Sequence, residues 1–223
     1  MNIKEDILLN NHHFIAFNKP NGMAVQSIHQ KEESLEVILR NYCKIPLQLI
    51  HRIDQPCSGI VLFGKKKSSA AYLHDLMSKQ LIIRQYLAVV PGKPKDESGT
   101  LVHYLFAHKQ SNKTFVVDEH HKEGKLSRLD YRWIGSISDH RHIIALTLNT
   151  GRHHQIRVQL ATIGWPIDGD RKYGSKTMIN EKGIALHSWK MKFPHPVDKT
   201  EIQIEAGLPN NELWKGVHDL LKK

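Results

Sequence analysis

The sequence predicts an α+β fold with a mixed, largely antiparallel central sheet flanked by helices. Strand-like and helix-like segments follow one another without the strict strand–helix–strand order that a doubly wound parallel sheet requires. Apolar and polar residues alternate over 129–133, which indicates a strand with one face in solvent. The chain is long enough to bury a substantial core, and no linker, repeat or low-complexity tract divides it. We therefore expect a single domain that spans residues 1–223.

The expected strands are short runs that are apolar or alternating and are bounded by turn-forming residues. They are residues 14–17, 60–63, 81–90, 129–133, 143–148 and 201–205. The run 81–90 gives the strongest strand signal in the chain. The stretch 91–99 is expected to be a loop, and 100–124 is polar with a weak pattern.

The expected helices are segments whose apolar residues recur at helical spacing. They are residues 34–43, about 68–79, the part of 150–160 that follows a turn, and about 211–221. Ser34 is a candidate N-cap for the first helix, and either Ser68 or Ser69 is a candidate for the second, because serine side chains can accept hydrogen bonds from the first helical amides.

The charge of the chain favours a polyanionic partner. The 32 Lys and Arg residues outnumber the 22 Asp and Glu residues, which gives a formal charge of +10, and 16 His residues add to it when protonated. Such an excess favours nucleic acid over a membrane surface. The two cysteines form no C-x-x-C pair, as is typical of a reducing compartment. With no signal-like N-terminus and no long apolar stretch, we expect a cytoplasmic protein.

The stretch 51–59 sets a charged pair beside the apolar run 60–63. Arg52 and Asp54 flank one aliphatic residue, and Pro56 and Gly59 then force a turn into the expected strand. Charged side chains are rarely buried unless they are paired. Asp54 is therefore either a turn cap or a carboxylate that takes part in chemistry.

A second polar segment, 150–160, begins as a turn and continues as a helix. Its first turns carry Arg152, His154, Gln155 and Arg157, and helix amides at such a position can bind phosphate. Lys19, on a turn near the N-terminus, is a further candidate phosphate contact. The neighbouring His pairs of the chain lack metal-ligand spacing, so we expect solvated or nucleic-acid-facing histidines and no metal.

Several stretches together resemble the RluA-type family of RNA pseudouridine synthases. Residues 51–59 resemble its H-R-L-D-x-x-T-S-G signature, 84–88 its K-x-Y-x-A strand, and 151–160 its G-R-x-H-Q-I-R-x-H-L segment. The outer motifs at 18–22, 164–174 and 186–188 fit as well, in the same order. The departures are Ile53 for Leu, Cys57 for Thr and Gln159 for His. The resemblance covers about residues 8–205, and an N-terminal S4 module, which many relatives carry, is expected to be absent.

The resemblance implies a fold with an active-site cleft across the sheet and a reaction that converts uridine in RNA to pseudouridine without a cofactor. Asp54 would be the essential carboxylate, which either attacks C1′ as a nucleophile or takes a proton from C2′. Arg157 would pair with it, Tyr86 would stack on the base and assist proton removal from C5, and Leu186 would wall the uracil pocket. The target nucleotide must flip out of its stack, and Arg52 is the candidate to fill the vacated space.

The expected partner is therefore RNA, with ribosomal RNA favoured and tRNA next, bound by a monomer that uses neither a membrane nor a metal. Arg52, Lys19, Arg152, His154 and Gln155 are the candidate RNA contacts. The alternative is a non-catalytic RNA-binding module or RNA chaperone on the same scaffold, which the charge and the run 65–67 fit equally well. Binding alone, however, requires no Asp54, Tyr86 and Arg157 at these spacings. A metal-dependent nuclease is a weaker alternative, because the sequence has no visible carboxylate cluster.

Overall fold

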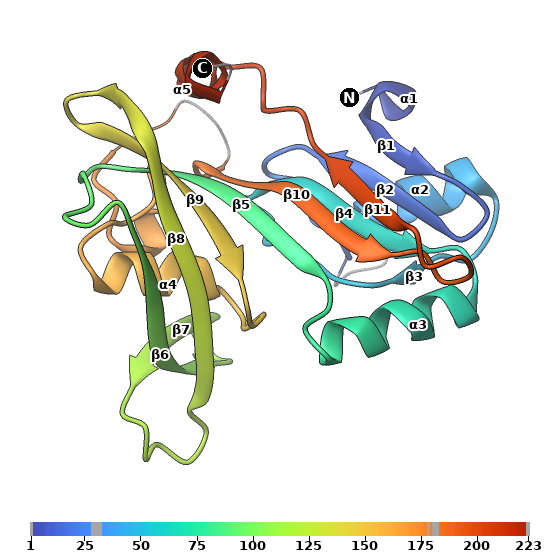
Figure 1. Ribbon diagram of the computed structural model, residues 1–223, viewed down its shortest axis with the longest axis horizontal. Helices are drawn as coiled ribbons and strands as arrows, with labels where there is room; N and C mark the ends of the chain where they lie inside the picture. Colours follow the sequence, from blue (N-terminus) through green and yellow to red (C-terminus); the bar gives the residue numbers. More distant parts are fainter. Residues whose placement is uncertain (1, 28–32, 178, 180–182, 222–223) are drawn as a thin grey trace. The chain divides into compact units, whose positions relative to one another are not determined.

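The computed structural model describes residues 2–27, 33–177, 179 and 183–221. The chain forms two compact units. Unit 1 comprises Met1–Arg84 and His187–Pro209, and unit 2 comprises Gln85–Leu186 and Asn210–Lys223. Strands β5 and β10 each pass from one unit into the other (Figure 1). That the two units act as one catalytic domain over 1–223 stays a prediction.

Unit 1 is built around β4, a strand whose residues are all buried. Its strands are β1 (Ile7–Asn10), β2 (Phe14–Lys19), β3 (Gln48–Leu49), β4 (Ser58–Gly64), β10 (Leu186–Pro194) and β11 (Glu201–Glu205). Strand β4 pairs antiparallel with β2 and β3 and parallel with β10. The outer pairs β1–β2 and β10–β11 are antiparallel. A run of buried strand residues with partners on both sides explains why 60–63 is apolar throughout.

The helices of unit 1 are α1 (Ile3–Asp6), α2 (Leu35–Cys43) and α3 (Lys67–Ser78). Helix α3 packs on β3 and β4 through Ala70, Leu73 and Leu76. The expected helices are confirmed, but the N-cap of α3 is Lys66 and no side-chain cap is formed there. Ser69 is instead buried, and its hydroxyl contacts His13 Nδ1 at 3.1 Å.

Unit 2 is an antiparallel sheet in the order β5, β9, β8, β6, β7. The strands are β5 (Ile83–Val90), β6 (Ser98–His108), β7 (Lys113–Val117), β8 (Lys125–Ser138) and β9 (Arg141–Leu148). Strand β7 and most of β6 lie within the stretch 100–124, where the sequence pattern is weak, and β6 begins two residues earlier, in the expected loop 91–99. Most of β6 alternates between exposed and half-buried positions, so few of its residues carry the apolar signal of a core strand.

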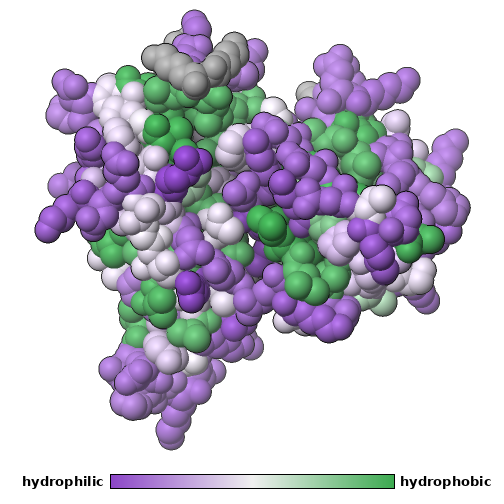
Figure 2. All heavy atoms as spheres, viewed as in Figure 1, coloured by the Kyte–Doolittle hydropathy of each residue, from purple (hydrophilic) through white to green (hydrophobic). Residues whose placement is uncertain are grey.

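Three short helical elements accompany this sheet: α4 (Gln155–Thr162), the 3-10 helix η1 (Arg171–Tyr173) and α5 (Glu212–Leu221). Helix α4 packs on β6 and β7, and α5 packs on β8. Hydrophobic residues reach the surface of both units in separate areas among hydrophilic ones (Figure 2). The predicted α+β fold with a largely antiparallel sheet is therefore confirmed. Of the strand pairs described above, β4 and β10 form the parallel one.

Candidate active site

Asp54 lies on a tight turn that leads directly into the core strand of unit 1. The amide of Cys57 donates to the carbonyl of Asp54 at 3.0 Å and closes the turn through backbone atoms. Ile53 and Cys57, on either side, are buried, whereas Asp54 is half-buried. The two apolar residues thus anchor the turn in the core and hold the carboxylate at its border, where a substrate could reach it.

The buried side chain of Lys19 stabilises the Asp54 turn through hydrogen bonds. The lysine side chain is fully buried, and the three N–H groups of its ammonium group are shared among four backbone carbonyls. Two of these belong to the loop after β2, at Pro20 and Met23, and two belong to the Asp54 turn, at Gln55 and Cys57. Burial lowers the pKa of Lys19 to about 8, while Cys57 and Asp54 oppose that shift. The group therefore stays protonated at neutral pH and can hold all four carbonyls.

The prediction that Lys19 contacts RNA phosphate is wrong. A lysine with no exposed surface cannot reach a phosphate, and its hydrogen bonds are directed to the backbone. The loop after β2 adds further contacts to the same turn, since the Gly22 amide donates to the Gln55 carbonyl at 2.9 Å and Asn21 Nδ2 donates to the Pro56 carbonyl at 3.0 Å. The turn-forming stretch 18–22 therefore fixes the conformation of the Asp54 turn.

Lys19→Gln should lower the free energy of unfolding by about 1–3 kcal/mol, because buried carbonyls lose their donor. It should also lower any activity that depends on Asp54. The dependence of RNA binding on salt should not change, whereas loss of a true phosphate contact reduces the salt slope by about 1. Arg52→Gln is the matched control, because Arg52 is exposed and is expected to contact RNA. A reduced salt slope for Lys19→Gln would contradict the stabilising role.

The end of the turn meets β10 at a very close approach. Gly59 has φ +105°, and a Cβ atom there would lie 2.2 Å from the carbonyl oxygen of Ser188. Ser58 Oγ lies 2.9 Å from Nδ1 of the buried His187. Burial lowers the pKa of His187 to about 4, so the ring is neutral at neutral pH. The Ser-Gly pair of the motif thus joins the Asp54 turn to β10, the strand that begins at Leu186.

Arg157 of α4 is buried in unit 2, paired with a carboxylate that the sequence reasoning missed. Its Nε donates to Asp170 Oδ2 at 2.7 Å, and its Nη2 donates to Oδ1 at 2.9 Å. The side chains are 6% and 1% exposed. The guanidinium carbon also lies 5.1 Å from the centroid of the Tyr173 ring. A bidentate pair of this kind fixes the plane of the guanidinium as well as its position.

Tyr173 joins the start of α4 to β7. Its hydroxyl accepts from the Thr114 amide at 2.9 Å and lies 2.8 Å from His154 Nδ1. Burial raises the pKa of Tyr173, and the hydrogen bond from Thr114 opposes that shift. His154 caps α4 with a left-handed backbone and stacks on His153. These contacts hold the helix that carries Arg157 against the strand next to it.

Two more of the expected RNA contacts, Gln155 and His154, make hydrogen bonds within the protein, and a contact of either with RNA stays a prediction. Gln155 is buried, and its Oε1 accepts from Thr150 Oγ1 and the Arg152 amide while its Nε2 donates to the Arg128 carbonyl. His154 is buried beside Tyr173. Both side chains therefore hold the start of α4 to neighbouring segments of unit 2. Arg152 is exposed, and it stays a predicted RNA contact together with Arg52.

Tyr86 and Leu186 occupy buried strand positions in unit 2. Tyr86 lies on β5 opposite Leu146 of β9 and is 6% exposed. Leu186 begins β10 and is 3% exposed. Asp54 belongs to unit 1, and Tyr86, Arg157 and Leu186 belong to unit 2. Their catalytic roles and the pairing of Arg157 with Asp54 stay predictions.

Asp170 lies within the stretch 164–174, so its presence in a family motif was visible from the sequence. Its pairing was not, because a partner 13 residues away across a loop follows no helical or strand period. Among the described residues, no group of three or more His, Cys, Asp or Glu side chains is arranged to hold a metal ion. Within the same residues, no helix has the length and apolar character needed to cross a membrane.

Comparison with solved structures defines the class of fold. The chain superposes on human RNA pseudouridylate synthase domain containing 4 with a TM-score of 0.78, at 19% identity, over 99% of this chain and 94% of that one. Human RNA pseudouridylate synthase domain containing 1 gives a TM-score of 0.76, at 18% identity, over 100% of this chain and 96% of that one. The fold is therefore that of a pseudouridine synthase domain. Residues 13–162 match the RNA pseudouridylate synthase family, and the chain belongs to that family.

Curated relatives agree with this assignment. Ribosomal large subunit pseudouridine synthase C of Rickettsia felis is 33% identical over 198 residues, which cover 87% of this chain and 65% of the relative. The protein of that name from Rickettsia bellii is 32% identical over 209 residues, which cover 92% of this chain and 69% of the relative. Uncharacterized RNA pseudouridine synthase YhcT of Bacillus subtilis is 30% identical over 221 residues, which cover 92% of this chain and 68% of the relative. The chain thus spans about two thirds of the length of these relatives.

Proposed function

We propose that this chain is an RNA pseudouridine synthase, an isomerase that acts on specific uridines in structured RNA. The observation that carries the proposal is the Asp54 turn, in a chain that belongs to the RNA pseudouridylate synthase family. Two buried residues and the Lys19 ammonium group fix this turn, and a half-buried carboxylate stands on it. A protein that merely binds RNA has no need of a carboxylate held in this way.

The reaction breaks the bond between N1 of uracil and C1′ of the ribose and forms a bond between C5 and C1′. The proton on C5 is lost, N1 gains one, and the product is an isomer of the substrate. Asp54 attacks C1′, or it takes a proton from C2′ on a route through a glycal. The target nucleotide flips out of its stack to reach the carboxylate, and Arg52, which is exposed beside Asp54, fills the space that it leaves.

Tyr86, Leu186 and Arg157 complete the site in this proposal. Tyr86 stacks on the uracil and assists removal of the C5 proton, and Leu186 supplies an apolar wall. Arg157 pairs with the Asp54 carboxylate. Its orientation, fixed by Asp170, supports this role, because a guanidinium that is already held loses little freedom on pairing.

The RNA in question is ribosomal RNA, with tRNA as the second candidate. The names of the Rickettsia relatives, ribosomal large subunit pseudouridine synthase C, support this choice. The formal charge of +10 favours a polyanion as well. The free cysteines Cys43 and Cys57 are typical of a reducing compartment, and we assign the protein to the cytoplasm. It acts as a monomer without a metal or other cofactor.

The proposal is tested by tritium release from RNA labelled at C5 of its uridines. The purified protein should release tritium from a transcript of large-subunit ribosomal RNA, and EDTA should not alter the rate. A matched transfer RNA transcript tests the second substrate. Binding of both RNAs without release of tritium would instead favour a chaperone on the same scaffold, and release that EDTA abolishes would favour metal-dependent chemistry.

A further inference from the structure

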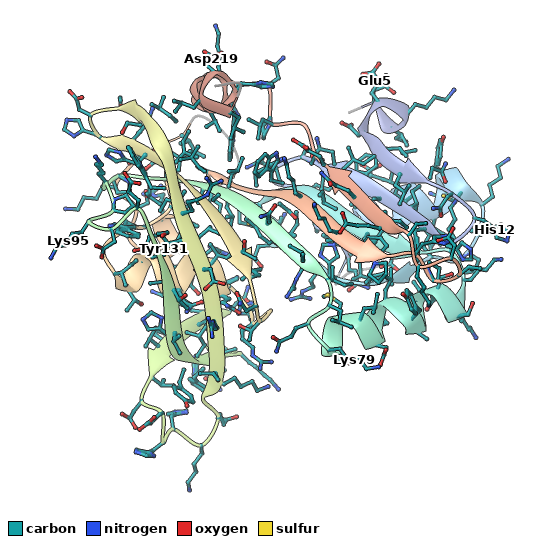
Figure 3. All side chains as sticks on the ribbon, viewed as in Figure 1. Glu5, His12, Lys79, Lys95, Tyr131 and Asp219 are labelled. Atoms are coloured by element: carbon teal, nitrogen blue, oxygen red, sulfur yellow. The ribbon has the colours of Figure 1, made fainter. Side chains whose placement is uncertain are left out.

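Basic side chains from three loops gather at one end of unit 1. The loops connect β1 to β2, β4 to α3, and β10 to β11. These loops and the first residue of α3, Lys67, contribute the seven residues that we call the His–Lys patch: His12, His13, Lys65, Lys66, Lys67, His195 and Lys199. Figure 3 labels His12, on the first of these loops. The family motifs and the candidate site contain none of these residues.

Direct contacts join the three loops. The amide of Lys65 donates to the carbonyl of His13 at 2.8 Å. The Lys66 ammonium group is in hydrogen-bond contact with His12 Nε2. The rings of His13 and His195 meet edge to face, with centroids 5.1 Å apart. The patch is therefore a folded surface of unit 1, and the run 65–67 is one part of it.

The patch has a marked excess of positive charge. Four lysines lie in it, and Lys66, Lys67 and Lys199 are exposed. Asp198 contacts the patch through a 2.9 Å hydrogen bond with His195 Nδ1, and it offsets one of these charges. Burial lowers the pKa of His13, and His195, Lys66 and His12 lower it further, because a proton on His13 would add a positive charge beside theirs. A bound polyanion would relieve this repulsion.

The patch and Asp54 lie at opposite ends of β4. Asp54 precedes the strand, Lys65 follows it, and the strand contains seven residues. At a rise of about 3.3 Å per residue, the strand alone separates them by about 20 Å. Successive phosphates of one strand lie about 3.4 Å apart along the axis of double-stranded DNA, and the spacing in an RNA helix is of the same order. A phosphate at the patch therefore belongs to RNA on the order of six steps away from the nucleotide at Asp54.

We propose that the His–Lys patch binds phosphates of the RNA that flanks the target uridine, as a second contact region remote from Asp54. The inference rests on the proposed function, since it assumes that RNA is the substrate. Lysine ammonium groups are compact point charges suited to phosphate, and the imidazole N–H groups add further donors. The patch anchors a long RNA, and a short RNA that ends near the target uridine does not reach it.

The test compares two variants that remove the same charge. Lys66, Lys67 and Lys199 are changed together to Gln, and in the control Lys4, Lys79 and Lys95, which are also exposed, are changed together to Gln. Figure 3 shows Lys79, near the end of α3, well away from His12 within unit 1. The binding probes are two RNA hairpins with the same loop, one with a long stem and one with a stem too short to span β4.

The patch variant should bind the long hairpin about tenfold or more weakly than the wild type. Its slope of log affinity against log salt should fall by about 2 to 3, as loss of three phosphate contacts requires. Its affinity for the short hairpin should match that of the control. On a long substrate its KM should rise while kcat stays unchanged. Thermal unfolding of both variants checks that they are folded.

Equal affinity of the two variants for the long hairpin would overturn the inference, even if the wild type makes pseudouridine. Equal losses on the long and short hairpins would overturn it as well, because the patch would then act at the target itself. Failure of the wild type to release tritium would instead contradict the proposed function. A patch-dependent affinity for the long hairpin would still support the second contact region in that case.

Discussion

Asp54→Asn should abolish tritium release from RNA labelled at C5 of uridine. The amide has nearly the same shape as the carboxylate, but it is neither a nucleophile for C1′ nor a base for C2′. Loss of a group that forms or breaks bonds commonly lowers kcat by about 10⁴-fold or more. The backbone bond from Cys57 to the Asp54 carbonyl is not altered by the change, so the turn should keep its conformation.

This variant also separates chemistry from folding and binding. Its unfolding temperature and its affinity for the RNA transcript should equal those of the wild type. Asp75→Asn is the matched control, because Asp75 is an exposed carboxylate of unit 1 that pairs with Lys79 on α3; it should retain full turnover. Retained turnover in Asp54→Asn would remove Asp54 from the mechanism and, with it, the main support for the proposed function.

The elements that the sequence predicted best are those with a clear periodicity of apolar residues or a clear boundary residue. Helix α2 follows Ser34 and ends at Cys43, as its spacing indicates, and β11 covers 201–205 as expected. Strands β6 and β7 were missed because their side chains lie largely on half-exposed faces. The start of α3 was misplaced because serine at 68 or 69 is a common capping residue, whereas here Ser69 is packed against His13.

The motifs of the candidate site could be found in the sequence, but the roles of several polar residues in them could not. A polar residue in a motif is readily interpreted as a contact to the substrate. In the structure Lys19 and Gln155 are buried and hydrogen-bond to the backbone instead. A sequence gives no measure of burial for a single polar residue, and buried polar groups need partners. The stretch 18–22 therefore has a positioning role, and the same holds for the first residues of α4.

Arg157→Lys should lower the rate of pseudouridine formation by about tenfold to a hundredfold. Lysine keeps the charge, but its ammonium group cannot make two parallel hydrogen bonds to Asp170 and also contact the Asp54 carboxylate as a guanidinium can. Loss of a hydrogen bond between charged groups costs about 1.5–3 kcal/mol, which corresponds to this range of rates. Wild-type activity in Arg157→Lys would argue against a contact of Arg157 with the reacting carboxylate.

Asp170→Asn distinguishes a structural role of Arg157 from a role at Asp54. It leaves the buried guanidinium without its carboxylate partner and should lower the free energy of unfolding by about 3–5 kcal/mol. If Arg157 acted merely as a structural residue, both variants would lose activity in proportion to their loss of stability. If Arg157 also contacts Asp54, Arg157→Lys should lose more activity than its loss of stability explains, whereas Asp170→Asn, in which the guanidinium remains, should not.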